Sequence, residues 1–287
     1  MRDTVSSSNI NDKIVAIILN YNSSDDCESC ICDLKKQENV NLEIVVVDNC
    51  SSSHELERIK DICIQNECTL LLNTINNGYS AGNNIGLRYA SDNDYQFVAI
   101  VNPDMLFPDK TVMRRLVDEL IKDEDAVIAS SNILYHGRPQ NPMPDYNYLS
   151  ELFWFMPFNV RKKKINLKEK TYCSTLSGCF FVAEMSFLHQ INFLDENVFL
   201  YQEEYILSKQ VEKLEKKMLF IPFVYAVHNH FEKKKGNIKY RLNQLRKSRM
   251  YFYNRYCNYS FLKKHLLFAS QEIQYGFVKF VFFLKYM

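Results

Sequence analysis

Three polar features of this sequence combine residue types that could bind a charged ligand and move a proton. Asp104 follows Pro103 after an apolar run, His228 closes another apolar run, and Glu203 and Glu204 interrupt an aromatic and aliphatic stretch. Carboxylate and imidazole groups are suitable ligands of divalent cations. A carboxylate among apolar neighbours has a raised pKa, which suits a general base. The combination predicts metal-assisted chemistry with an acidic proton acceptor.

Each of these features also has a purely structural explanation. Asn-Pro-Asp is common in the turn after a strand, and adjacent glutamates are common on a solvated helix face. A histidine after an apolar run is more often structural than a ligand, and His230 could replace His228 as the ligand. The chemical interpretation therefore depends on whether the fold gathers these groups.

Strand-like and helical segments alternate over the first 200 residues, and these segments must position the candidate acids and histidines. Four short apolar runs are expected to be strands: residues 13–19, 42–47, 69–72 and 96–101. Helices are expected at residues 24–39 and 55–66, and after the loop 76–84. This alternation predicts an α/β fold with a mainly parallel central sheet flanked by helices.

Polar residues follow each of the four predicted strands. They are Asn20, Tyr21 and Asn22 after the first strand, Asp48 and Asn49 after the second, the loop with Gly82 and Asn83 after the third, and Asn102 and Asp104 after the fourth. Ligands of open α/β sheets bind beyond the carboxyl ends of the strands. We therefore expect these residues to line one crevice.

The later part of the chain divides less clearly. Prolines interrupt residues 132–170, which we interpret as a surface excursion that forms a lid or a substrate-facing loop. Residues 177–182 are expected to be a strand that enters a helix, and the chain after residue 230 is expected to be helical. We predict a polar tail at 1–11, a catalytic domain at 12–230 and a basic, aromatic helical region at 231–287.

Charge is distributed unevenly along the chain. The net charge is +1, but residues 231–287 contain 13 Lys or Arg and 2 Asp or Glu, so the preceding residues are acidic overall. The basic region is either a solvated helical cap, a contact in a homodimer, or a surface that attracts phospholipid head groups or a lipid-linked diphosphate. Nucleic acid is a poor partner because the acidic body would repel it.

The nine cysteines suggest a reducing compartment. Their number is odd, and the first apolar run after a polar start is too short for an export signal. Cys27, Cys30 and Cys32 lack a second pair at zinc-ribbon spacing, so we expect reduced cysteines on a helix. No apolar run approaches the roughly 18 residues that span a bilayer. We expect a cytoplasmic protein.

Six motifs occur in an ordered set: IVAIILNYN, IVVVDN, NNGYSAGNNIGL, VNPD, SGCFFVAEMSFLHQINFLDENVFLYQEE and VHNH. In order and approximate spacing, this set resembles the family 2 glycosyltransferases, which have a GT-A fold. It looks most similar to the branch that contains rhamnosyltransferases of bacterial surface polysaccharides. The resemblance covers about residues 12–256.

The resemblance implies a role for each candidate residue. Asn20, Tyr21, Asn22, Asp48 and Asn49 would hold the nucleoside, and Gly82 and Asn83 would lie along the ribose and diphosphate. Asp104 would bind Mg²⁺ or Mn²⁺, with Asn102 in place of the first acid of that motif and His228 as a second metal ligand. Glu204, with Glu203 beside it, would supply the base, and Ser177 and Gly178 would lie on the acceptor side.

Two motifs depart from the family pattern. The usual Glu-Asp-x-Asp is Glu203-Glu204-Tyr205-Ile206 here, which leaves the choice of base between Glu203 and Glu204 open. Asn229 and His230 follow His228 in place of glycines and a serine, so either histidine could be the ligand. The Gln-x-x-Arg-Trp signature of processive synthases is absent, which favours addition of a single sugar.

The resemblance implies inverting transfer of one sugar from a UDP- or dTDP-sugar, with dTDP-rhamnose among the candidates. The acceptor would be a saccharide or a lipid-diphosphate-linked sugar in bacterial polysaccharide synthesis, at the inner face of the plasma membrane. A nucleotide-binding scaffold subunit is the main alternative because the acidic motif is altered. A dinucleotide-binding oxidoreductase is disfavoured because Gly78, Gly82 and Gly86 are four apart.

Overall fold

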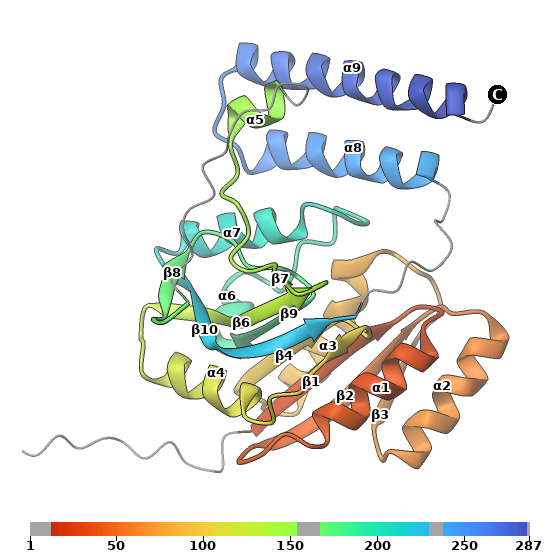
Figure 1. Cartoon of the computed structure of the whole chain (residues 1–287), viewed down its shortest axis with the longest axis vertical. Coiled ribbons are helices and arrows are strands. Elements are labelled where there is room, and N and C mark those ends of the chain that lie inside the picture. The colour runs from red at the N-terminus through yellow and green to blue at the C-terminus, as the bar shows by residue number, and fades with distance from the viewer. Residues whose placement is uncertain (1–12, 154–166, 230–237, 286–287) are drawn as a thin grey trace, which may run out of the picture.

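The computed structural model describes residues 13–153, 167–229 and 238–285. The polar tail 1–11 and His230 lie outside the described residues, as does Trp154. Within these ranges, a mixed sheet is flanked by helices on both faces and extended by two C-terminal helices (Figure 1). The predicted α/β architecture is therefore confirmed.

The sheet runs in the order β3-β2-β1-β4-β9-β6-β10-β5. These strands are β3 (Thr69–Asn73), β2 (Asn41–Asn49), β1 (Lys13–Asn20), β4 (Phe97–Val101), β9 (Phe180–Glu184), β6 (Ala126–Tyr135), β10 (Lys217–His228) and β5 (Met105–Leu106). The first four strands are mutually parallel, as are β6 and β10, whereas β9 is antiparallel to both β4 and β6. Two short strands, β7 (Arg138–Pro139) and β8 (Thr171–Cys173), pair with β6 and β10.

Helices cover both faces of the sheet because its central strands are apolar on both sides. In β1, Ile14, Ala16 and Ile18 belong to one core cluster, and Val15 and Ile17 to the other. One face carries α1 (Ser24–Leu34), α2 (Ser53–Gln65) and α4 (Val112–Ile121). The other carries α3 (Tyr79–Asp92), α6 (Met185–Gln190) and α7 (Glu203–Lys213).

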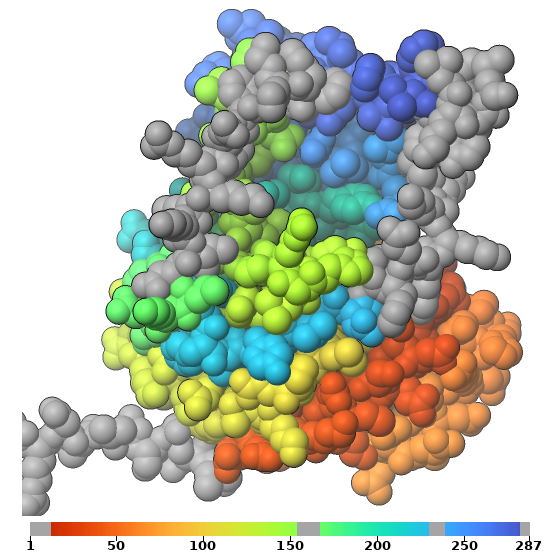
Figure 2. Space-filling model, viewed as in Figure 1, coloured from red at the N-terminus to blue at the C-terminus, as the bar shows by residue number. Residues whose placement is uncertain are grey.

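The C-terminal helices form a further layer beyond α7. The helices α8 (Ile238–Arg255) and α9 (Phe261–Lys285) lie side by side, with α5 (Tyr148–Leu152) against α9 (Figure 1). A third apolar cluster, which includes Phe252, Tyr253 and Leu267, joins these helices to Val198 and Ile206. In Figure 2, the dark blue atoms of α9 lie at the top of the molecule.

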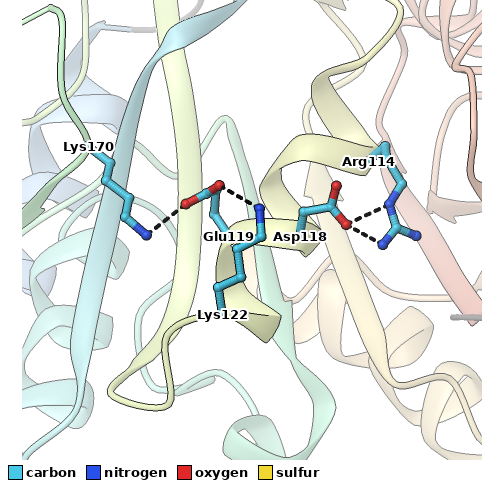
Figure 3. Close-up of polar contacts among 5 residues, drawn as sticks. All are labelled: Arg114, Asp118, Glu119, Lys122 and Lys170. Atoms are coloured by element: carbon cyan, nitrogen blue, oxygen red, sulfur yellow. Dashed lines mark hydrogen bonds and ion pairs between the residues drawn. The ribbon is translucent and has the colours of Figure 1, made fainter. Parts of the chain in front are cut away.

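Ion pairs attach the segment before β8 to the sheet-covering helix α4. Glu119 pairs with Lys170 at 2.7 Å and with Lys122 at 3.2 Å, and Arg114 pairs with Asp118 (Figure 3). Burial acts to raise the pKa of Glu119, but hydrogen bonds from Lys170 and Lys122 outweigh it and lower that pKa. The Lys170–Glu119 pair attaches the residue before β8 to α4, and the other two pairs lie along α4 itself.

Several predicted boundaries were wrong. The helix expected at 24–39 ends at Leu34, and α3 begins at Tyr79, so Gly82 and Asn83 lie inside a helix and not in a loop. A Cβ on Gly82 would lie 2.5 Å from Leu19 Cδ1, so a larger residue there would have to displace the Leu19 side chain between α3 and β1. Residues 177–179 precede β9, which starts only at Phe180.

The predicted start of the surface excursion, residue 132, was also wrong, because the sheet continues beyond it. Residues up to Tyr135 continue β6, and β7 then turns back along it, so residues 132–139 belong to the sheet. The three clustered cysteines lie on a helix, as expected: Cys27 and Cys30 are buried in α1, and Cys32 is exposed on it. Over the described ranges, no helix combines the length and apolarity needed to cross a membrane.

Candidate functional site

The ends of β1 and β2 form one polar cluster at the carboxyl edge of the sheet. Parallel pairing places Asn20 opposite Asp48, and Asn20 Nδ2 donates to Asp48 Oδ1 at 3.0 Å. The other carboxylate oxygen accepts from Ser51 N at 3.0 Å, and Ser51 Oγ accepts from Asn22 N at 2.9 Å. Tyr21 is half exposed between these residues. The candidates expected to hold the nucleoside, Asn20, Tyr21, Asn22 and Asp48, therefore lie together and form what we call the nucleoside cluster. Ser51, which was not predicted from the sequence, lies at its centre.

Asn49 takes part in a second network, which holds the start of α3. Its Nδ2 donates to Asn76 Oδ1 at 3.1 Å and to Gly78 O at 3.3 Å, and its Oδ1 accepts from Asn73 at 2.8 Å. Asn83 is fully buried and donates to Tyr79 O at 3.0 Å, while its Oδ1 has no hydrogen-bond partner among the described residues. The Asn-rich motif therefore shapes the helix start next to the nucleoside cluster.

Asp104 and His228 meet although 124 positions separate them. Antiparallel pairing of β5 with β10 sets His228 opposite Met105, and His228 Nε2 lies 3.2 Å from Asp104 Oδ1. Both side chains are largely buried. On its other side, His228 Nδ1 lies 3.1 Å from Gln140 Oε1. The carboxylate-imidazole pair expected from the sequence is therefore present.

The hydrogen-bond pattern of this pair fits a divalent cation. The Gln140 amide oxygen can only accept, so Nδ1 of His228 carries a proton and its Nε2 faces Asp104. At 3.2 Å, either a proton on Nε2 or a cation held by both groups joins the imidazole to the carboxylate. Metal-bound histidines commonly donate their other N–H to an oxygen, as here. Asp104 and His228 are thus suitable ligands.

A larger protein-only metal cage is not seen. In the described part of the chain, no group of three or more His, Cys, Asp or Glu side chains could hold a metal ion. A cation held by one carboxylate and one imidazole fits sites in which phosphate oxygens and water complete the coordination. The geometry therefore suits a cation that arrives with, or is completed by, a phosphorylated ligand.

A chain of contacts leads from this pair to the segment before β9. Cys179 Sγ lies 3.8 Å from Gln140 Oε1 and 3.1 Å from Ser177 Oγ, and Ser177 N donates to Asn141 Oδ1 at 2.8 Å. Burial raises the pKa of Cys179 to about 12, and the charges of Asp104 and Glu204 both act on its thiol. Cys179 therefore lies between the two candidate metal ligands, Asp104 and His228, and the two glutamates Glu203 and Glu204, which we call the acid pair.

Asn102 contributes to this junction through its backbone. Its N–H donates to Cys179 O at 2.8 Å, which ties the turn before Asp104 to the segment before β9.

The acid pair begins α7 and faces the same segment. A Cβ on Gly178 would lie 3.2 Å from Glu204 Oε1, and Tyr79 Oη donates to Gly178 O at 2.5 Å. Both glutamates line a pocket between α7 and the sheet, whose walls are mostly apolar: Ile128, Leu176, Phe181, Leu194, Ile206, Leu207 and Met218. The solvated-helix-face explanation therefore does not hold for these two side chains.

Burial changes the acidity of both glutamates. Desolvation, followed by the charge of Glu204, raises the pKa of Glu203 to about 8. Desolvation also raises the pKa of Glu204, although a backbone hydrogen bond from Gly178 acts against it. Two adjacent buried carboxylates resist ionising together, so the pair holds a proton at a pH where isolated carboxyl groups are ionised.

Sequence reasoning missed three residues of this site: Gln140, Ser51 and Tyr79. Gln140 lies just after β7 in the segment interpreted as a surface excursion, and only sheet pairing brings it to His228. Ser51 lies two residues after the IVVVDN motif and could have been proposed as a turn residue. Tyr79 is part of a quoted motif, but no local pattern indicates its contact with Gly178.

Comparisons with known proteins agree with this architecture. The chain is 30% identical over 196 residues to the low-salt glycan biosynthesis hexosyltransferase Agl10 of Haloferax volcanii, and the alignment covers 67% of this chain but only 59% of that relative. Residues 15–191 match the family described as Glycosyl transferase family 2.

Solved structures share the fold at low sequence identity. Mannosyltransferase PcManGT from Pyrobaculum calidifontis, in complex with GDP-Man and Mn²⁺, aligns over 91% of this chain and 73% of its own, with 14% identity and a TM-score of 0.60. GalNAc-T7 with UDP, GalNAc and Mn²⁺ aligns over 84% and 49%, with 18% identity and a TM-score of 0.64. S. aureus TarS (residues 1–349) aligns over 90% and 70%, with 15% identity and a TM-score of 0.55.

These matches confirm the GT-A-like fold expected from the motif order. The family match alone covers more than half of the chain. It includes the strand ends, the start of α3 and the turn that carries Asp104. The protein therefore belongs to glycosyltransferase family 2.

Proposed function

We propose that this protein transfers a single hexose from a nucleoside-diphosphate sugar to an acceptor hydroxyl with inversion at the anomeric carbon. The observation that carries the proposal is the meeting of Asp104, His228 and Glu204 around the Gly178–Cys179 segment at one rim of the sheet. The hexosyltransferase relative supports the sugar class, and the neighbours solved with GDP-Man or UDP support a nucleotide donor.

The donor would lie across the carboxyl edge of β1 and β2. Asn20, Asn22 and Asp48 form the nucleoside side of the crevice, together with Tyr21 and Asn49. Asn83 Oδ1 is a buried acceptor near the helix start and suits a ribose hydroxyl. UDP- and dTDP-sugars, dTDP-rhamnose among them, are the donors to be screened.

Asp104 and His228 would hold a divalent cation, Mg²⁺ or Mn²⁺. The neighbours solved with Mn²⁺ support this choice. Such a cation, when bound, supplies positive charge that offsets the negative charge developing on the leaving diphosphate. Gln140 keeps the imidazole of His228 in the tautomer that can act as a ligand.

Glu204 is the proposed base. It removes the proton from the acceptor hydroxyl, whose oxygen bonds to the anomeric carbon as the bond to the diphosphate oxygen breaks on the opposite face. Burial and the charge of Glu204 raise the pKa of Glu203 to about 8, and in this proposal Glu203 holds the shared proton while Glu204 is the ionised member of the pair. Ser177 and Gly178 border the acceptor side because they contact Cys179 and Glu204.

The acceptor would be a saccharide or a lipid-diphosphate-linked sugar of a bacterial surface polysaccharide, reached at the inner face of the plasma membrane. Two features of the helices α8 and α9 support binding to an anionic membrane surface. Leu262, Leu266, Ile273, Phe277 and Phe280 are all exposed and recur along one side of the helix. Across residues 239–281, Glu272 is the only acid beside nine Lys or Arg.

Replacing Glu204 by Gln tests the catalytic proposal. The variant should lose about 10²- to 10⁴-fold in transfer rate, the usual contribution of a general base. Its affinity for the nucleotide should be nearly unchanged because the acid pair lies apart from the nucleoside cluster. The measurement is release of nucleoside diphosphate from a panel of nucleotide sugars with Mn²⁺ and candidate acceptors, beside titration of nucleotide binding.

Asp104→Asn is the matched comparison, because it should lose Mn²⁺ dependence together with turnover. Near-normal transfer by the Glu204→Gln variant would overturn the assignment of the base. Absence of any metal-dependent release of nucleoside diphosphate by the wild type, with nucleotide binding intact, would instead favour the scaffold-subunit alternative.

A further inference from the structure

The segment Asp195–Gln202, which leads directly into the acid pair, is held from two sides. On the catalytic-domain side, Asn84 exchanges two hydrogen bonds with the backbone of Leu194, at 2.8 and 3.0 Å. Tyr79 N donates to Phe199 O at 2.9 Å, and a Cβ on Gly78 would collide with the Phe199 backbone. The start of α3 therefore fixes one side of this segment.

The helix α8 and Tyr256, the residue that follows it, fix the other side. Tyr251 Oη and Tyr256 Oη both donate to Asp195 Oδ2, at 2.8 and 2.5 Å. Ser248 Oγ donates to Leu200 O at 2.8 Å. Phe252 and Tyr253 of α8 are fully buried in the cluster that contains Val198. Polar and apolar contacts thus join α8 to both ends and the middle of the segment.

The segment ends in a backbone conformation that needs such support. Tyr201 and Gln202 have φ values of 74° and 75°, a left-handed conformation that side-chain-bearing residues rarely adopt in succession. Arg241 Nε of α8 donates to Tyr201 Oη at 2.9 Å. Glu203 and Glu204 follow at once, so the direction in which both carboxylates point depends on these two residues.

We propose that α8 is a positioning element of the active site: the hydroxyls of Tyr251 and Tyr256 hold Asp195, and through the segment 195–202 they aim the carboxylate of Glu204 at the acceptor. The inference rests on the proposed function, because it assumes that Glu204 is the base. It assigns a catalytic contribution to a helix outside the region that matches the family. Neither tyrosine touches the substrate; both act through Asp195.

The test is the double variant Tyr251→Phe/Tyr256→Phe, which removes two hydroxyls and leaves the rings that pack in place. We expect kcat to fall roughly 10- to 100-fold, as for small misplacement of a catalytic group. KM for the donor and the affinity for nucleotide with Mn²⁺ should stay within about twofold, since the nucleoside cluster and Asp104 do not contact the segment. Tyr275→Phe, on α9, is the matched control and should behave as wild type.

A second variant separates positioning from loss of folding. Asp195→Asn keeps the size of the side chain and one acceptor oxygen, so it should restore part of the kcat lost in an Asp195→Ala variant. A normal kcat in the double tyrosine variant would overturn the inference, as would a loss of nucleotide affinity equal to the loss of kcat. Failure of the proposed function looks different, because Glu204→Gln itself would then remain active.

Discussion

At the scale of single residues, the site depends on side chains that orient others. Of the two candidate metal ligands, Gln140 contacts only His228. Its contact with Nδ1 leaves the other imidazole nitrogen, Nε2, facing Asp104. Cys179 is buried between Asp104 and Glu204 with a raised pKa, so it is a neutral spacer and not a nucleophile near pH 7. Gln140 and Cys179, both uncharged, therefore connect the Asp104–His228 pair to Glu204.

The role assigned to Gln140 leads to a prediction about metal affinity. In a Gln140→Leu variant, His228 loses the acceptor that fixes its tautomer, so Mn²⁺ affinity measured with bound nucleoside diphosphate should fall about 10- to 100-fold. Isothermal titration of Mn²⁺ into the nucleotide complex measures it. Gln190→Leu, on the surface of α6, is the control. Unchanged Mn²⁺ affinity in Gln140→Leu would show that Gln140 does not orient a ligand.

At the scale of elements, the first turns of α3 and α7 carry candidate site residues at the carboxyl edge of the sheet. The helix α3 presents Asn83 and Tyr79 to the site, and α7 presents the acid pair. The helices α8 and α9 carry the two remaining proposals: α8 contacts the segment before the glutamates, and α9 carries a row of exposed apolar side chains. Buried Leu267 and Gln271 face inward from α9, and the apolar stripe faces outward.

The outward stripe of α9 leads to a prediction about membrane binding. In the double variant Phe277→Ser/Phe280→Ser, binding to vesicles of phosphatidylglycerol should weaken at least tenfold, because burying each phenylalanine is worth roughly 1.5–3 kcal/mol. Co-sedimentation with these vesicles, compared with phosphatidylcholine vesicles and at two salt concentrations, measures it.

Ile64→Ser/Ile75→Ser is the matched control, since these isoleucines are 75% and 62% exposed elsewhere on the surface. Membrane binding that is equal in both variants, or equal on neutral and anionic vesicles, would contradict the proposed surface. A concentration-dependent dimer that the α9 variant abolishes would instead assign the stripe to a second copy of the chain.

At the scale of the whole molecule, the acid pair makes global stability depend on pH. The folded state raises the pKa of Glu203 from 4.5 to about 8, so the folded protein holds this proton more tightly than the unfolded chain does. The resulting stabilisation is complete below pH 4.5 and is lost as pH rises towards 8. Glu204, whose pKa is also raised, acts in the same direction.

The Glu203→Gln variant should therefore lose less stability than the wild type between about pH 5 and about pH 9. Calorimetric Tm values across this range measure the difference, at about 2–4 °C for each kcal/mol. Glu212→Gln, an exposed change on the same helix, should follow the wild type. Parallel Tm profiles for Glu203→Gln and the wild type would show that Glu203 is not held in a desolvating site.

The sequence alone determined the fold class, the order of the first four strands along the chain and most of the site's candidate residues. Buried parallel strands are continuous apolar runs, and their polar ends are adjacent in sequence to those runs, so both signals are local. Asn20, Asp48 and Asp104 could be placed at one edge because parallel strands share their carboxyl ends.

Only the tertiary structure decided which distant groups meet. The pairing of β5 with β10 brings Asp104 to His228, β7 brings Gln140 beside them, and α8 reaches Asp195 across more than 50 positions. Gly82 was expected in a loop, whereas it lies inside α3 and packs against Leu19 of β1. Such contacts depend on strand order, register and side-chain packing between remote segments, which no local pattern of residues encodes.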